Sequence, residues 1–259
     1  MMRHVSTVLW WTFGVAAVVF MLAPLVLLVV FSFSASSNMT VPITGWSLRW
    51  YETVFDTPQF WSALRNSVII GLSVGLVSTV VGTMAALAAA QMRPAVAGAL
   101  MLLLSLPVML PPLVLSLSLR TLVVTTDNTL GLHAVIVGHL VYTQPFVALI
   151  VYARMSNFDR AIIDSASDLG AGPWTIFRTV VLPIIRPTVI GAGLIAMALS
   201  LDDFVITLFN IGGGNTLPTY MWGMLRRGVT PGINVVGIVL VALIVLASLI
   251  ALRVTRYRG

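Results

Sequence analysis

The sequence of 259 residues contains no cysteine and no lysine, and it has few charged residues of either sign. The absence of cysteine excludes disulfide frameworks, thiolate metal sites and cysteine nucleophiles. The absence of lysine excludes a standard GxxxxGK[ST] phosphate-binding loop, so the chain is not expected to hydrolyse ATP itself. Charged residues make up 8% of the chain, whereas soluble globular domains carry roughly 25%. A soluble enzyme is therefore a weak hypothesis.

Apolar residues are abundant instead, at 59% of the sequence, which indicates lipid as the solvent. The formal net charge of +6 is carried by arginine alone. These arginines lie at the edges of apolar runs, as in membrane proteins, and form no basic patch or stripe. We therefore expect a lipid bilayer, and no nucleic acid, as a partner.

Charged residues divide the sequence into six apolar runs, each long enough for the about 20 residues that cross a bilayer. The predicted spans cover residues 9–33, 67–91, 98–125, 132–153, 187–210 and 233–253. The first run exceeds the 7–15 residues typical of a signal peptide's apolar region, which favours a retained span. The prediction is an all-α polytopic membrane protein, with residues 1–259 forming one transmembrane domain.

The distribution of arginine predicts the orientation of these spans. With both termini in the cytoplasm, most arginines fall on the inner side, as the positive-inside rule requires. The loops near Trp50, Asp127 and Thr219 then lie outside. The first outer loop is rich in aromatic residues and predicts a short helix at the outer surface, with a carbohydrate-stacking platform as the alternative.

Small residues and prolines mark two of the predicted spans. Gly71 and Gly75 begin a stripe of small residues in the second span, which indicates close helix packing. Pro107, Pro111 and Pro112 interrupt the third span and predict a bend or break. Such a break is tolerated where protein or a cavity covers it. Two interpretations stay open: a break beside a solute pathway, and a structural bend.

The sequence offers no catalytic or metal-ligating constellation. His133 and His139 have the wrong spacing for an HExxH site and no carboxylate accompanies them. A secondary carrier driven by an ion gradient is a competing hypothesis, but it would require broken helices at corresponding places in two repeated halves. Only the third span is interrupted in this way, and no internal repeat is visible.

The most informative segment is the inner loop over residues 154–186. Four of its apolar residues can share one face of a short helix: Ile162, Ile163, Ala166 and Leu169. Asp164 and Asp168 are spaced i, i+4 on a neighbouring face. Gly170 and Gly172-Pro173 are expected to end this helix. Spacing alone does not distinguish a partner-binding helix from a solvated surface helix.

This loop resembles the EAA motif of bacterial ABC importer permeases, which reads EAA, three residues, Gly, nine residues and Ile-x-Leu-Pro. The matching residues are Asp164-Ser165-Ala166, Gly170 and Val180-Val181-Leu182-Pro183. The resemblance implies the type I (MetI-like) permease fold with six transmembrane helices. It also implies a coupling helix that docks on an ATPase, with these ATPase-coupling residues: Asp164, Ser165, Ala166, Asp168, Gly170, Leu182 and Pro183.

A wider resemblance, over nearly the whole chain, is to spermidine/putrescine permeases of the PotC type. The residues that carry it are Trp50-Tyr51, Asn66-Ser67, Leu106-Pro107, Pro111, Tyr152-Ala153-Arg154, Leu199-Ser200-Leu201-Asp202-Asp203, Leu217-Pro218-Thr219-Tyr220 and Arg226. One departure is Pro112, where these permeases often carry an aspartate. Polyamine is the implied solute, and an opine, an amino-acid-like amine, a phosphonate and iron stay as alternatives.

The resemblance also implies the partners. They are a second, different permease subunit, two ATPase subunits that bind ATP and magnesium, and an extracytoplasmic solute-binding protein. The implied location is the bacterial inner membrane, and no cofactor is expected in this chain.

Asp202 and Asp203 are the candidate residues of the solute pathway. Carboxylates within a membrane span are costly and mark pathways or ion pairs. Adjacent residues on a helix point about 100° apart, so both can face the interior only where the helix is irregular. One interpretation is attraction of an amine-bearing solute. The other is structural pairing with Arg120 or another buried donor.

Overall fold

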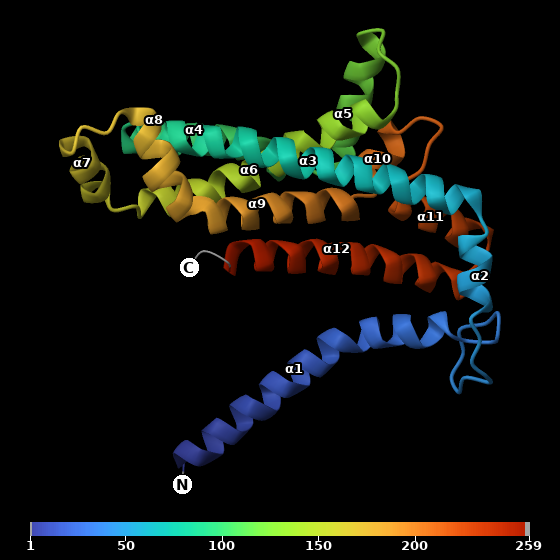
Figure 1. The fold of residues 1–259 in the computed structure, drawn as a ribbon. Helices are drawn as coiled ribbons and strands as arrows, with labels where there is room; N and C mark the ends of the chain where they lie inside the picture. Colours follow the sequence, from blue (N-terminus) through green and yellow to red (C-terminus); the bar gives the residue numbers. More distant parts are fainter. Residues whose placement is uncertain (1, 257–259) are drawn as a thin grey trace. The chain divides into compact units, whose positions relative to one another are not determined.

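The computed structural model describes residues 2–256, and almost all of this chain is helical (Figure 1). It divides into two compact units. One unit combines the chain up to Trp61 with Tyr220–Ala242, and the other combines Ser62–Thr219 with the chain from Leu243 onward. The helices are α1 (Met2–Ser32), α2 (Arg49–Phe55), α3 (Pro58–Ala90), α4 (Pro94–Met109), α5 (Pro112–Thr125), α6 (Leu132–Ser156), α7 (Arg160–Asp168), α8 (Pro173–Ile176), α9 (Leu182–Asp202), α10 (Val205–Asn210), α11 (Leu217–Arg227) and α12 (Gly232–Arg256).

Within the described residues, 5 helical stretches are long and apolar enough to cross a membrane, and up to 6 if the bent pair α4 and α5 counts as one span. The predicted six spans are thus present, but two predicted outlines were wrong. The third span is two helices bent by 93°. The fifth is a continuous helical stretch over Pro173–Asp202, not residues 187–210.

The break between α4 and α5 follows from two consecutive prolines. A residue that precedes proline is driven out of the helical region into an extended conformation. Leu110 precedes Pro111 and has ψ 140°, and Pro111 precedes Pro112 and has ψ 133°. Two successive extended residues end α4, and Pro112 then begins α5, where a missing N–H costs nothing. Pro107 is accommodated within α4.

Proline does not end the fifth span, because the helix widens before Pro183. A proline ring clashes with the carbonyl four residues earlier and removes one N–H donor. The segment Phe177–Val181 is π-helical and joins α8 to α9 without a break. A π turn relieves such a clash by enlarging the ring of the helix. The sequence prediction treated Pro183 as a boundary and therefore placed the start of this helix too late.

The first unit contains the aromatic segment after α1. Phe60 is fully buried and packs with the rings of Phe55, Trp61 and Tyr220 at centroid distances of 5.5, 5.2 and 6.5 Å. The indole Nε1 of Trp50 donates to the carbonyl of Ser34 at 2.9 Å. The predicted short helix is α2. Its neighbouring rings pack mainly on one another, which favours a structural role over a stacking platform.

The second unit is built on close contacts of α3, α6 and α9. A Cβ added at Gly75 would lie 3.0 Å from the Cβ of Met197 in α9. One added at Gly82 would lie 2.7 Å from the Cβ of Val147 in α6. The stripe of small residues therefore serves packing within this chain, as predicted. In Figure 1, α7 and α8 lie at one end of this unit, and α5 and α10 lie at the other.

Candidate functional site

The helix of the EAA-like loop, α7, is capped at both ends by its own sequence. The carboxylate of Asp159 accepts a hydrogen bond from the backbone N–H of Ala161 at 3.0 Å, which satisfies a free donor of the first turn. At the other end, the N–H of Gly170 donates to the carbonyl of Ser167 and the N–H of Ala171 donates to that of Ala166. This pair of bonds is a Schellman motif, which requires a left-handed residue. Gly170 has φ +82°.

One face of α7 packs against the helix that follows it. Ile163 and Ala166 contact a buried cluster that contains Val181 and Ile185. The two ends of the EAA-like motif therefore meet in one core, which explains why a small residue is needed at position 166. The predicted apolar face was only half right, since Ile162 is 43% exposed and Leu169 is 89% exposed.

The physical reason for this difference is the length of α7. The helix has 9 residues and ends at Asp168, so Leu169 occupies the C-cap and lies outside the helical register. An apolar residue this exposed is unusual for a solvated surface helix and marks a contact surface.

Beside α7 lies a groove of about 440 Å³, formed together with the end of α3 and with α8. Asp164 and Arg160 line this groove. Arg160 also donates from Nη2 to the carbonyl of Ala90, the last residue of α3, at 2.7 Å. The arginine thereby attaches the start of α7 to the end of a long membrane helix.

The predicted coupling residues divide into two groups in the structure. Asp164, Ser165 and Asp168 are exposed on α7. Leu182 and Pro183 form the first turn of α9 and belong to a membrane-spanning stretch. The structure thus offers the acidic residues of α7 to a partner, and it places the Leu-Pro end of the motif at the start of a span.

A second candidate site lies where α9 ends. Asp202 is the last residue of α9, and Asp203 is extended at φ −66° and ψ 124°. The two carboxylates therefore differ: Asp202 is exposed, whereas the side chain of Asp203 is 12% exposed. The Oδ1 atom of Asp203 accepts a hydrogen bond from the N–H of Thr207 at 3.0 Å and so caps the start of α10.

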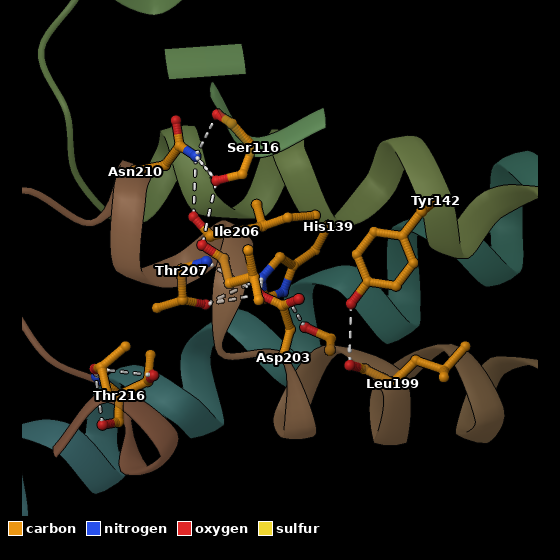
Figure 2. Close-up of polar contacts among 12 residues, drawn as sticks. Ser116, His139, Tyr142, Leu199, Asp203, Ile206, Thr207, Asn210 and Thr216 are labelled. Carbon is orange, nitrogen blue, oxygen red and sulfur yellow. Dashed lines mark hydrogen bonds and ion pairs between the residues drawn. The ribbon is translucent and has the colours of Figure 1, made fainter. Parts of the chain in front are cut away.

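His139 of α6 is fully buried beside this break, as Figure 2 shows. Its Nε2 lies 3.1 Å from Oδ1 of Asp203 and 3.1 Å from Oγ1 of Thr207. Its Nδ1 lies 2.8 Å from Oγ of Ser200, in the last turn of α9. One imidazole therefore satisfies polar groups on both sides of the break.

Tyr142, one turn further along α6, satisfies a carbonyl that the break leaves open. Its hydroxyl donates to the carbonyl of Leu199 at 3.0 Å (Figure 2). The N–H of Asp203 would accept this role in a continuous helix, but the helix ends one residue earlier. The side chain of Tyr142 thus replaces a backbone donor.

The two helix breaks meet at one cavity of about 170 Å³. Asp203 lines it from the break between α9 and α10, and Leu110 and Pro112 line it from the break between α4 and α5. Tyr142 and Phe146 complete its wall from α6. A partly buried carboxylate beside aromatic rings is a chemically suitable setting for a cationic amine. The proline break therefore lies beside the candidate pathway, as one of the two sequence interpretations predicted.

The predicted pairing of an aspartate with Arg120 was wrong, because Arg120 is engaged elsewhere. It donates from Nη1 to the carbonyl of Phe209 at 2.6 Å, near the end of α10. Asn210 is buried and donates to the carbonyls of Ser116 and Ile206 at 3.2 and 2.9 Å (Figure 2). These bonds fix α10 to α5. The second option of the structural interpretation, another buried donor, is present as His139.

Sequence reasoning considered His139 only as a metal ligand and missed its contact with Asp203. The available signal was the position of an ionisable side chain within an apolar span, which marks a functional candidate. Its partner could not be read from spacing, because the two residues lie 64 positions apart.

The fold and these two sites define a multispanning permease subunit with an exposed helix between two spans. Residues 78–257 match the family described as binding-protein-dependent transport system inner membrane component, and the chain belongs to this family. The prediction of a transport subunit, not an enzyme, is confirmed by this membership. So is the prediction of an ABC importer permease over an ion-coupled carrier.

Among curated relatives, the chain is 32% identical over 240 residues to the putrescine transport system permease protein PotI of Escherichia coli (strain K12), covering 90% of this chain and 85% of that protein. It is 30% identical over 236 residues to the spermidine/putrescine transport system permease protein PotC of Haemophilus influenzae, covering 88% and 90%. The predicted resemblance to polyamine permeases is confirmed.

Solved structures share the fold. A permease chain of a bacterial ABC transporter that imports the polysaccharide alginate matches with a TM-score of 0.75 at 15% identity, covering 96% of each chain. A chain of the MetNI methionine ABC transporter matches with a TM-score of 0.65 at 21% identity, covering 78% of this chain and 98% of that one. The predicted MetI-like architecture is thus confirmed.

Proposed function

We propose that this permease carries an amine-bearing, cationic solute of the polyamine class past the Asp203 carboxylate. The observation that carries the proposal is the cavity at the two helix breaks, which Asp203 lines together with Tyr142 and Phe146. A carboxylate attracts the ammonium group, and the aromatic rings attract it through their faces. The names of the relatives PotI and PotC support the same solute class.

Pro112 distinguishes this chain within that class. It lines the same cavity as Asp203, at the position where the polyamine permeases that it resembles often carry an aspartate. The cavity wall therefore has one carboxylate fewer at this point. We expect this to favour a solute with fewer ammonium groups, so putrescine is preferred to spermidine.

The proposed assembly contains a second, different permease subunit, two ATPase subunits and an extracytoplasmic solute-binding protein. ATP and magnesium bind to the ATPase subunits. The exposed residues Asp164, Asp168 and Leu169 of α7 support docking of this helix on the ATPase. With α7 on the ATPase side, the chain lies in the inner membrane with both termini in the cytoplasm.

The experiment is uptake of radiolabelled putrescine by cells that lack other polyamine importers and express the whole transporter. Unlabelled spermidine, an opine, an amino-acid-like amine, a phosphonate and ferric iron serve as competitors. We expect saturable uptake that requires an active ATPase and that putrescine inhibits more strongly than spermidine. A transporter inactivated in its ATPase is the control. Competition by a phosphonate or iron, without competition by amines, would contradict the proposal.

A further inference from the structure

One buried side chain connects both sides of the break between α9 and α10. His139 reaches Ser200 in the last turn of α9 through Nδ1 at 2.8 Å. It reaches Asp203 at the break and Thr207 in α10 through Nε2, both at 3.1 Å. The imidazole is 0% exposed and belongs to α6, a separate span. The break is thereby fixed from a neighbouring helix.

The chemistry of these partners fixes the direction of the central hydrogen bond. An ionised carboxylate can only accept, so Nε2 of His139 donates to Oδ1 of Asp203. The Nδ1 atom is then free to accept the hydroxyl proton of Ser200. Every group in the contact has a partner, as a buried polar network requires.

Only one oxygen of Asp203 takes part in this network. The backbone N–H of Thr207, its hydroxyl and Nε2 of His139 all contact Oδ1, at 3.0, 3.4 and 3.1 Å. Among the described residues, no hydrogen bond to Oδ2 is present, and the side chain lines the cavity of about 170 Å³. Holding Oδ1 restricts rotation of the carboxylate and leaves Oδ2 available to a ligand.

We propose that His139 is a positioning residue for solute recognition, which holds Oδ1 of Asp203 so that Oδ2 is presented to the ammonium group of the solute. This inference rests on the proposed function, because it assumes that Asp203 meets the solute. A pre-positioned carboxylate binds more tightly than a mobile one, since less freedom is lost on binding. His139 therefore affects the KM of uptake through Asp203 and not by contact with the solute.

Two substitutions separate the contacts of His139. In His139→Asn the amide group can reach the position of Nδ1 but not that of Nε2, so the contact with Asp203 is lost. In His139→Gln an amide nitrogen can reach the position of Nε2 and still donate. His133→Gln, on an exposed histidine of the same helix, is the matched control. Each variant is measured in the whole transporter by KM and maximal rate of putrescine uptake and by co-purification of the ATPase.

We expect His139→Asn to raise KM about tenfold, as the loss of one hydrogen bond to a charged group predicts, with the maximal rate and assembly retained. His139→Gln should recover part of this loss, and His133→Gln should match the wild type. The double variant His139→Asn with Asp203→Asn should be no worse than Asp203→Asn alone, because coupled residues are not additive.

Three outcomes would overturn the inference. They are an unchanged KM in His139→Asn, additive effects in the double variant, and loss of assembly in His139→Asn, which would assign the imidazole to the fold alone. If Asp203→Asn is impaired while His139→Asn is normal, the inference fails and the proposed function stands. If Asp203→Asn itself transports normally, the proposed solute pathway fails.

Discussion

The guanidinium of Arg160, at the first residue of α7, donates to the carbonyl of Ala90 at the last residue of α3 over 2.7 Å. The final carbonyls of a helix lack partners within the helix and carry partial negative charge. A cation that binds one of them satisfies an acceptor and also interacts favourably with the helix dipole. This bond attaches the proposed coupling helix to a long membrane helix 70 positions away.

Replacement of Arg160 should weaken the coupling of ATP hydrolysis to transport. We expect Arg160→Ala to lower uptake about two- to tenfold and to raise the ATP hydrolysed per solute, because α7 loses its attachment to α3. Arg160→Lys keeps the charge and should fall between the two. ATPase and uptake rates in reconstituted vesicles measure this ratio. Arg253→Ala, an exposed arginine of α12, is the control, and an equal effect there would contradict the assignment.

Gly170 and Gly172 form a matched pair that separates backbone strain from steric collision. A Cβ at either position would have no neighbour within 4 Å in this chain. Gly170 has φ +82°, whereas Gly172 has φ −72°. Alanine at position 170 should therefore cost about 1–2 kcal/mol at the end of α7 and lower uptake, while Gly172→Ala is tolerated.

The measurement for this pair is uptake, together with co-purification of the ATPase to report docking. Equal loss in both variants would show that the side chains collide with the ATPase and that the conformation of Gly170 is not the cause. Wild-type uptake and assembly in Gly170→Ala would contradict the coupling assignment.

Asparagine at the two adjacent aspartates should give unequal effects. Asp203→Asn removes the charge from the cavity but keeps an oxygen that can accept from the N–H of Thr207, so assembly should persist. We expect it to reduce uptake about tenfold or more, and Asp202→Asn to reduce uptake less. Asp127→Asn is the control, because asparagine tolerates the φ of 54° found there. Normal uptake in both Asp202→Asn and Asp203→Asn would exclude the carboxylates from the pathway.

Single cysteines test the orientation directly, because the chain has none of its own. Ser167 of α7 and Asn128 after α5 are both exposed. A membrane-impermeant maleimide should label Asn128→Cys in intact cells, and it should label Ser167→Cys only after permeabilisation. Labelling of Ser167→Cys from outside would reverse the proposed topology.

The sequence determined the features that depend on local chemistry. Six apolar runs determined the spans, because each lacks the charges that a bilayer excludes. Pro111 and Pro112 determined the break between α4 and α5, since steric restriction of the preceding residue acts within one peptide unit. Gly170 likewise determined the end of α7, through a left-handed conformation that only glycine adopts at little cost.

Only the tertiary structure decided which polar groups meet. His139 and Asp203 are 64 positions apart, and Arg120 reaches Phe209 across 89 positions, so neither partner follows from spacing. The π-helical turn before Pro183 likewise depends on the packing of Val181 and Ile185 in the core, which holds the widened helix continuous. Local propensity acts over a few residues, whereas the burial of a polar group is settled by whichever helix the fold places beside it.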